Sequence, residues 1–430
     1  MKAKEKCYNG ITLVSLVITI IILLILAGIT ISSLTNTGIF EKAKEAKEKT
    51  EAAERNQAET LNEYENAIAG NYTSPKKVQA DGSWNSTKKV NSPQLMEGMT
   101  GIYWDESGKE VEVNVDNQDN WYDYSASKRE WANAVTKDSS GNVTGYWVWI
   151  PRYAYKIESN RYSSTAGKIT VKFLQGTSNK DEENAEISQT YPSTSGATMS
   201  AYVVHPSFTD GSTKGKNNHY MNGEWDKEIP GYWVAKYAAG FQECTQTVNG
   251  STVIEPTIKT GNVKYSDKYY TSYNSSYTTN ALSQNLSSSG YSSQKLSYPV
   301  FKPLTYAYNC ITTGDIYTIS KEIASASDFY GLSSAKTDSH QMKNSEWGAV
   351  AYLTQSSSGR NGTEVTINSK NLSNLNSKYI YAVTGYAENT ANGVSASSTN
   401  NKTGIFDLSG CVWERTAAYI SNGNSSLSSY

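Results

Sequence analysis

The cysteine side chains are the first candidates for chemistry in this chain of 430 residues. Cys7 lies close to the amino terminus, whereas Cys244, Cys310 and Cys411 are scattered over the second half and form no CxxC pair. A thiolate site for a soft metal needs ligands that are close in space, and nothing in this spacing predicts it. We expect small buried cysteines with at most one disulfide among the last three.

The histidines are equally scattered. They form no HExxH and share no ligand spacing with the cysteines. We expect them to lie in loops, and we expect no metal and no cofactor. The histidines are His205, His219 and His340.

Three polar stretches imitate known sites only in part. Residues 116–120 (DNQDN) bring oxygens together but lack the glycine and the distal glutamate of a calcium loop. Ser333–Lys336 with Lys259–Gly261 resembles pieces of a Ser-Lys acyl-transfer set, but in the wrong order and with no SDN element between them. Gly211–Lys216 is too short for a phosphate loop. We therefore predict no catalytic residues.

A more specific pattern lies near the carboxyl end, where residues 404–416 read GIFDLSGCVWERT. This stretch resembles the DMSGNVWEWT signature of the formylglycine-generating enzyme (sulfatase-modifying factor) family. GYWVAKYAAGF (231–241) is similar to an early strand of that family, and NSEWGAVAYL (344–353) to its TEAEWEYAA helix. The signature positions that match include Asp407, Ser409, Gly410, Trp413 and Glu414.

The resemblance implies an α+β, C-type-lectin-like domain with irregular loops, in which Trp413 and Glu414 are structural. There are departures: Cys411 replaces the asparagine of the signature and Arg415 its second tryptophan. The family's closing strand does not follow, so we expect the domain to be incomplete at the C-terminus. The family's oxidase uses a late copper-binding cysteine pair, and no such pair follows Trp413.

The element that would position this domain is an apolar run from Gly10 to Ile31, with no charged residue between Lys6 and Glu41. About 20 apolar residues in a helix match the thickness of a bilayer. The lysines before it predict a cytoplasmic amino end and an extracytoplasmic remainder. A signal peptide and a plain single-pass anchor are the alternatives.

The basic leader ending in Gly10, followed by ITLVSLVITIIILLILAGI, resembles a type IV prepilin or type II secretion pseudopilin amino terminus. The resemblance implies cleavage by a prepilin peptidase between Gly10 and Ile11, and methylation of Ile11. The family's glutamate at the fifth mature position is Ser15 here, which removes the carboxylate that pairs with a neighbouring subunit's amine. Assembly as a major filament subunit is then in doubt, whereas anchoring is not.

Downstream elements follow from local patterns. Apolar residues and opposite charges, both at spacing three or four, predict a stalk helix over 39–70. Polar residues 71–92 suggest a linker. Residues 101–115 alternate around Ser107-Gly108 and predict a hairpin. Further predicted elements are strands at 145–151, 152–157 and 229–242, a helical part within 301–325, a helix over 344–355 begun by Asn344 or Ser345, and long, partly flexible insertions at 264–297 and 356–402.

Charge and composition limit the partners. The 39 basic and 41 acidic residues nearly balance, so we expect no nucleic-acid partner. The chain has 32 Tyr and 10 Trp but only 7 Phe, and such amphipathic rings suit binding surfaces. Partial disorder is the alternative interpretation of the polar second half.

The sequence therefore predicts an α+β protein with a long N-terminal membrane and stalk helix and a C-type-lectin-like domain with long polar loops. The expected divisions are a leader (1–10), a transmembrane helix (11–35), a stalk (39–70), a linker (71–92) and the domain (93–430). We expect a membrane-anchored, non-enzymatic, pilin-like or pseudopilin-like display or adhesion protein at the cell surface. Its partners would be the membrane, prepilin peptidase, other pilin-like subunits and an unknown extracellular ligand. A diversity-generating variable receptor and a formylglycine-generating-type oxidase are the alternatives.

Overall fold

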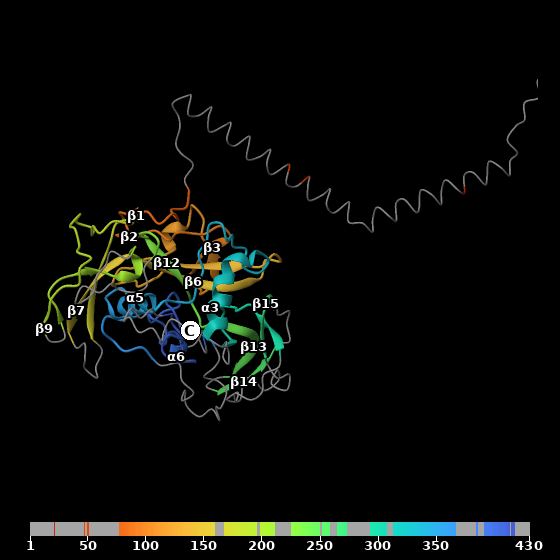
Figure 1. The fold of residues 1–430 in the computed structure, drawn as a ribbon. Helices are drawn as coiled ribbons and strands as arrows, with labels where there is room; N and C mark the ends of the chain where they lie inside the picture. The colour runs from red at the N-terminus through yellow and green to blue at the C-terminus, as the bar shows by residue number, and fades with distance from the viewer. Residues whose placement is uncertain are drawn as a thin grey trace, which may run out of the picture. The chain divides into compact units, whose positions relative to one another are not determined.

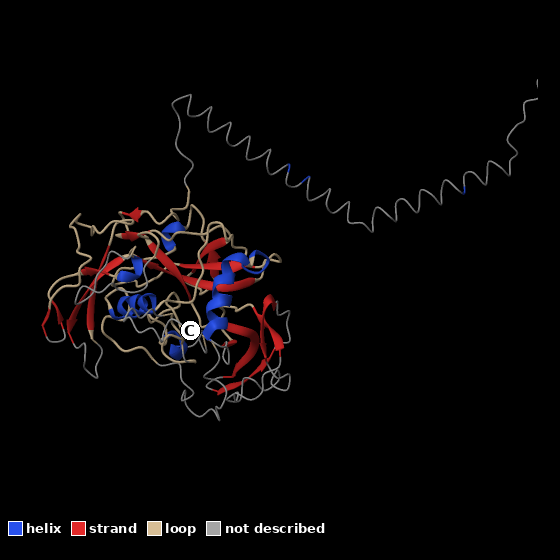
Figure 2. Ribbon diagram, in the orientation of Figure 1, coloured by secondary structure: helices blue, strands red, loops and turns tan. Residues whose placement is uncertain are grey.

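The computed structural model describes the chain mainly from Lys77 onward. The described residues are 77–159, 167–195, 198–210, 225–249, 252–258, 265–272, 293–307, 313–366, 384–385, 391–412 and 414–417, together with Ile21, Lys47 and Thr50. The chain divides into two compact units, Met1–Lys76 and Lys77–Tyr430. Figure 1 gives the order of the elements and Figure 2 their type.

A five-stranded antiparallel sheet forms the centre of the second unit. Its strand order is β12-β6-β5-β3-β4, which places β12 at one edge. The strands are β3 (Met99–Trp104), β4 (Glu110–Glu112), β5 (Asn133–Lys137), β6 (Val143–Pro151) and β12 (Gly231–Ala235). The predicted hairpin is confirmed, because β3 and β4 pair antiparallel around a turn in which Gly108 has φ +78°. A glycine adopts this left-handed conformation without steric cost.

The chain passes directly from the central sheet into a second sheet at Arg152. Pro151 ends β6, as its lack of a donor predicts, and β7 (Tyr153–Ser159) begins two residues later. β7 pairs with β8 (Lys168–Phe173) and β11 (Val203–Val204) in the order β11-β7-β8. The predicted strands at 145–151 and 152–157 are thus confirmed.

The remaining strands form smaller sheets. The third sheet has the order β14-β13-β17, and the others are two-stranded ribbons. Their bounds are β1 (Trp84–Asn85), β2 (Val90–Asn91), β9 (Thr194–Ser195), β10 (Thr198–Met199), β13 (Gly240–Asn249), β14 (Thr252–Ile258), β15 (Tyr265–Ser272), β16 (Ser293–Ser297) and β17 (Thr305–Ala307). β1 and β2 fall within residues 71–92, where polar composition suggested a linker.

The described helices are short. They are α3 (Thr313–Glu322), α4 (Ser327–Tyr330), α5 (Asn344–Gln355) and α6 (Ala391–Val394), with single 3-10 turns at η1 (Gln118–Asn120), η2 (Pro206–Phe208) and η5 (Ile323–Ser325). The predicted helix over 344–355 is confirmed, although its N-cap is Lys343 rather than Asn344 or Ser345. Glu346 closes its first turn by accepting the Lys343 backbone N–H at 2.7 Å. α3 confirms part of the helix predicted within 301–325, and β17 occupies another part.

The main core lies where the first two sheets meet α5. It contains Trp131, Trp149 and Tyr153 with Val350 and Leu353 of α5, all at most 1% exposed. The large aromatic side chains also bond through their polar ends, as Trp131 Nε1 does to Ser358 O at 2.8 Å and Tyr153 Oη to Ala349 O at 2.6 Å. Burial of each such side chain contributes about 1.5–3 kcal/mol, and the polar ends of Trp131 and Tyr153 are satisfied, whereas the buried Trp149 Nε1 has no hydrogen-bond partner among the described residues.

Two expectations are corrected, the fold class and the membrane-anchored, pilin-like assignment. The described chain is mainly antiparallel sheet, so the expected α+β class, with a long N-terminal helix before a C-type-lectin-like domain, is wrong. None of the helices in the described ranges has the length and apolar character that a bilayer crossing needs, which contradicts the expected transmembrane, pilin-like and membrane-anchored assignments. The leader, transmembrane and stalk ranges, with Gly10, Ile11 and Ser15, lie outside the described residues apart from Ile21, Lys47 and Thr50.

Candidate functional site

A cleft of about 460 Å³ runs along the edge strand β12 and between α3 and residues 405–416. Its walls are largely aromatic and aliphatic, and we call it the aromatic cleft. The aromatic residues that line it are Trp147, Trp225, Tyr232, Trp233, Tyr237, Phe301 and Phe406. From α3 and η5 it receives Ile316, Ile319 and Ile323. A mostly apolar concavity with a few convergent polar groups is the usual form of a small-molecule site.

The polar end of the aromatic cleft is built at the start of α5. His340 Nε2 lies 3.0 Å from Glu346 Oε1, and its Nδ1 lies 3.2 Å from Asp338 Oδ1. Burial by itself would lower the pKa of His340, but the bonds to the two carboxylates outweigh it and raise the pKa to about 9. The imidazole is therefore a cation at neutral pH, with its charge balanced by its carboxylate partners.

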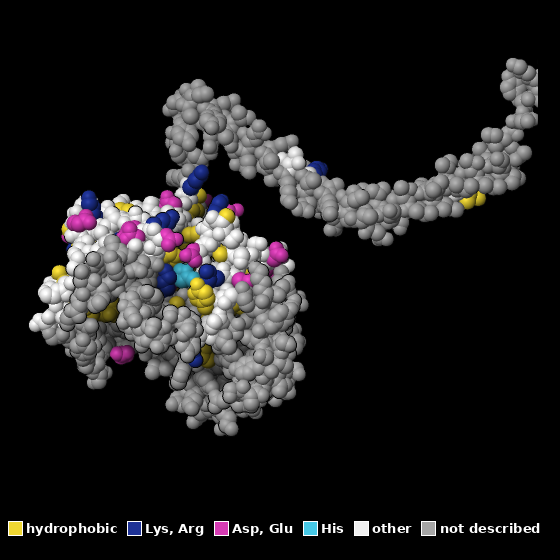
Figure 3. Space-filling view, in the orientation of Figure 1, with side chains coloured by type: hydrophobic (Ala, Val, Ile, Leu, Met, Phe, Trp, Pro, Cys, Tyr) yellow, Lys and Arg dark blue, Asp and Glu magenta, His cyan; other side chains and the backbone are white. Residues whose placement is uncertain are grey.

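Trp225 joins this polar end to the aromatic wall. Its ring lies edge-on to the His340 ring, with centroids 5.1 Å apart, and the Lys343 ammonium lies 4.3 Å from the Trp225 centroid. Lys343 Nζ also lies 3.8 Å from Glu346 Oε1. On the face shown in Figure 3, a histidine side chain lies at the surface beside Lys or Arg and hydrophobic side chains.

Glu414 supplies a second titratable group to the cleft lining. Its Oε2 accepts a hydrogen bond from Trp347 Nε1 at 2.6 Å. Glu414 is an exposed residue, but the protein that surrounds its carboxylate partly desolvates it, and this raises its pKa to about 7. A carboxyl group that titrates near neutral pH in a concavity is typical of functional sites.

A buried lysine holds the 402–406 segment against the central sheet. Lys236 is 1% exposed, and its ammonium donates to Asn133 Oδ1 at 2.9 Å, to Gly404 O at 3.0 Å and to Lys402 O. The ammonium also lies 4.7 Å from the ring centroid of Trp104. These contacts satisfy the charge and fix one wall of the cleft.

Asp407, a signature residue, has a structural position. Its side chain accepts the backbone N–H of Gly385 at 2.8 Å and of Ala238 at 3.2 Å, and only 2% of the residue is exposed. Its φ of +70° is a left-handed conformation, which aspartate tolerates better than most residues. Asp407 therefore joins the segment after β12 to the segment that carries Glu414.

The other signature residues are less closely connected. Ser409 Oγ donates to Thr366 O at 3.3 Å, Gly410 has φ +125°, and Trp413 lies outside the described residues. Cys411, where the resembled signature has asparagine, has φ +62°. Asparagine adopts that conformation more readily than cysteine does.

No family model, no curated protein and no solved structure matches this chain. Function therefore has to be argued from the geometry of the described residues.

Burial limits the reactivity of two further candidate groups, the Cys411 thiol and the His205 imidazole. The Cys411 thiol is free and buried, and burial raises its pKa well above its usual range, so it is not a reactive thiolate. His205 was expected in a loop and lies in the connection between β11 and η2, where it is 3% exposed and burial lowers its pKa to about 3. Within the described ranges, no three His, Cys, Asp or Glu side chains converge to hold a metal ion.

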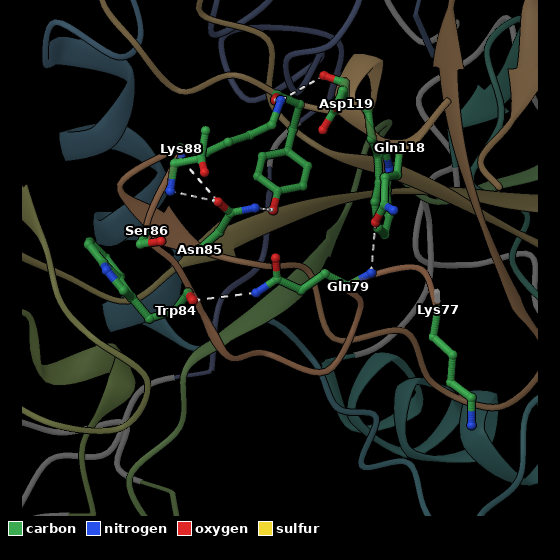
Figure 4. Close-up of a pocket in the computed structure, with 11 residues that line it drawn as sticks. Lys77, Gln79, Trp84, Asn85, Ser86, Lys88, Gln118 and Asp119 are labelled. Carbon is green, nitrogen blue, oxygen red and sulfur yellow. Dashed lines mark hydrogen bonds between the residues drawn. The ribbon is translucent and has the colours of Figure 1, made fainter. Parts of the chain in front are cut away.

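A second concavity lies at the β1–β2 ribbon, with a volume of about 380 Å³. Figure 4 shows the carboxamide side chains of Gln79, Asn85 and Gln118 around it, and we call it the amide pocket. Sequence reasoning missed both concavities as sites. The abundance of Tyr and Trp was the available signal for the first, whereas the polar composition of 71–92 concealed the second.

Proposed function

We propose that the unit from Lys77 onward is a non-enzymatic binding domain whose ligand occupies the aromatic cleft. The ligand would be a small amphipathic molecule, with an apolar ring or chain among the aromatic side chains and a polar end beside His340 and Glu414. The observation that carries the proposal is the convergence of these two titratable groups on a cleft of about 460 Å³ with aromatic walls.

The size and lining of the cleft support this ligand class. Drug-sized ligands occupy sites of about 300–1,000 Å³. Trp147 and Phe301 lie with ring centroids 4.8 Å apart, and Tyr237 stacks on Phe406 at 5.4 Å. Rings fixed by one another in this way lose little conformational freedom when a ligand binds, which favours affinity.

The ion pairs of His340 favour a ligand with little net charge over a strongly charged one. The His340 cation is bonded to Asp338 and Glu346, so it adds little net field. The Glu346 carboxylate, which lines the cleft, can still accept a hydrogen bond from the polar end of a ligand, because a carboxylate has several acceptor positions.

The experiment uses a neutral fluorescent probe, dansylamide, titrated into the full chain. Fluorescence should rise and shift to the blue as the ring enters the aromatic cleft. Ile316→Glu places a charge on the α3 wall and should weaken binding by about tenfold or more. Tyr317→Glu is the matched control, since Tyr317 is the next residue, is 49% exposed and does not line the cleft.

Tyr317→Glu should bind the probe within about twofold of the wild-type chain. Equal affinities for the two variants would contradict the proposal, because the probe would then bind elsewhere. Absence of binding by the wild-type chain would also contradict it.

A further inference from the structure

The amide pocket lies between residues 77–88 and the segment 118–122. β1 and the turn that follows it form one wall, and η1 with the residues after it forms the other. The side chains that face it are mainly carboxamides, hydroxyls and aromatic rings (Figure 4). This lining differs from the apolar lining of the aromatic cleft, so the two sites suit different ligands.

The carboxamides of the amide pocket are held in fixed orientations. The Gln79 backbone N–H donates to Gln118 Oε1 at 3.0 Å, and Gln118 Nε2 donates to Val115 O at 3.1 Å. Asn85 Nδ2 donates to Tyr122 Oη at 3.2 Å. Polar groups that are already oriented bind a ligand without a further entropic cost for ordering them.

The amide pocket has three charged groups in its lining, the ammonium groups of Lys77 and Lys88 and the carboxylate of Asp119. The Lys88 ammonium donates to Asp119 O and to Tyr122 O, each at 2.7 Å, and lies 5.1 Å from the Tyr122 ring centroid. Burial raises the pKa of Tyr122 to about 12, so its phenol stays neutral at physiological pH. The Asp119 carboxylate and the Lys77 ammonium, both exposed, have opposite charges. The lining therefore has one net positive charge, but the Lys88 ammonium already donates to two carbonyl oxygens, so the donors that an anion would need are partly engaged.

We propose that the amide pocket binds a neutral polyhydroxylated ligand, a saccharide. Each sugar hydroxyl is both a donor and an acceptor, as are carboxamides and a phenol, so the two sets of groups complement one another. The half-buried indole of Trp84 lines the same space and offers a flat apolar face to the C–H side of a sugar ring. The proposal is independent of the function proposed for the aromatic cleft, and either can fail alone.

The test is saturation-transfer-difference NMR with the full chain and three neutral probes, maltose, cellobiose and N,N′-diacetylchitobiose. At least one should bind, and inorganic phosphate should not compete with it. Gln79→Ala removes a carboxamide that is oriented by its bond from Nε2 to Ser83 Oγ at 3.1 Å, and it should weaken binding by about tenfold. Thr87→Trp fills the pocket from an exposed position and should abolish binding without removing a buried group.

Two controls make the outcome specific. Glu106→Trp, an exposed substitution in the β3–β4 turn, should leave saccharide binding within about twofold. Ile316→Glu, which disturbs the aromatic cleft, should also leave it unchanged. The proposal is overturned if none of the three saccharides binds, if phosphate displaces the bound saccharide, or if Thr87→Trp binds as well as the wild-type chain.

Discussion

The Arg152 guanidinium Nη1 lies 2.6 Å from Glu228 Oε2, and the Arg152 side chain has no exposed surface. Arg152 also donates to Phe208 O at 2.7 Å and to Ser178 O at 2.9 Å. Burial lowers the pKa of Arg152, and the Glu228 carboxylate opposes that shift. Arg152 lies where the chain leaves β6 for β7, and Glu228 lies three residues before β12, so the pair joins the junction of the two sheets to the segment before β12.

We expect Glu228→Ala to lower the free energy of unfolding by about 3–5 kcal/mol, because it leaves a buried guanidinium without its counter-charge. Denaturant titration followed by tryptophan fluorescence measures the change. The matched control is Glu97→Ala, which removes an exposed ion pair with Lys336 at 2.9 Å and should cost at most about 1 kcal/mol. If the two variants lost similar amounts of unfolding free energy, the hydrogen bonds from Arg152 to carbonyl oxygens would be sufficient to stabilise the buried guanidinium without Glu228.

Lys236→Met should destabilise the protein by about 3 kcal/mol or more, because it leaves the buried oxygens of Asn133 and Gly404 without a donor. It should also loosen the 402–406 wall, so dansylamide should bind more weakly. Lys109→Met, at an exposed position of the β3–β4 hairpin, is the control and should change stability by less than about 0.5 kcal/mol. An unfolding free energy unaltered by Lys236→Met would refute the structural role of the ammonium.

The His340 ion pairs should make part of the stability depend on pH. The folded-state pKa is raised from 6.5 to about 9, so the stabilisation is fully present below pH 6.5 and is lost as pH rises through 9. A shift of this size corresponds to roughly 3 kcal/mol. The difference in unfolding free energy between the wild-type chain and His340→Gln should therefore shrink between pH 6.5 and 9. A difference that is constant over this range would contradict the ion pairs.

His205 should show the opposite dependence. Its folded-state pKa is lowered to about 3 by burial, so the neutral form stabilises the fold above pH 6.5 and that contribution is lost as pH falls toward 3. The stability difference between the wild-type chain and His205→Gln should grow as pH rises from 3 to 6.5. NMR titration of the imidazole C–H signals gives a direct check, since His205 should remain neutral at pH 5 while His340 is charged.

Glu414 should couple charge at the aromatic cleft to pH. Its pKa of about 7 means that the carboxyl ionises between about pH 6 and 8. Dansylcadaverine, a cationic probe, should bind at least about threefold more tightly at pH 8 than at pH 6, because an ionised carboxylate attracts its ammonium. Neutral dansylamide should show little change, and Glu414→Gln should remove the effect for the cation. If the affinities of both probes depended equally on pH, the dependence would arise from a group other than Glu414.

Local patterns were sufficient to predict several strands and one helix. The Ser107-Gly108 turn identified the β3–β4 hairpin, and the apolar run ending at Pro151 identified β6, because side-chain alternation and proline chemistry act within a few residues. Asp407 and Glu414 were identified by resemblance alone, and neither the buried N–H partners of the first nor the raised pKa of the second is apparent from sequence.

The sites were harder to predict because their parts are distant in sequence. The aromatic cleft combines β12, α3 and residues 405–416, and no local period brings these together. The residues of the β1–β2 ribbon were interpreted as a linker because they are polar. The ribbon is stabilised by tertiary hydrogen bonds that the local sequence does not reveal, such as Asn91 Nδ2 to Pro230 O at 2.9 Å across 139 residues. Polar composition describes the exposed side of such a ribbon and not its contacts.

The contact between the residues at the start of β5 and the 402–406 segment can form only late in synthesis. The Trp131 backbone N–H donates to Thr403 Oγ1, and Asn133 Nδ2 donates to Thr403 O, across 272 and 270 residues. At translation rates of about 5–20 residues per second, the start of β5 is made roughly 15–50 s before this partner. During that interval the nascent chain holds aromatic side chains that are not yet covered, so chaperone binding on the ribosome should persist until the segment around Thr403 has emerged.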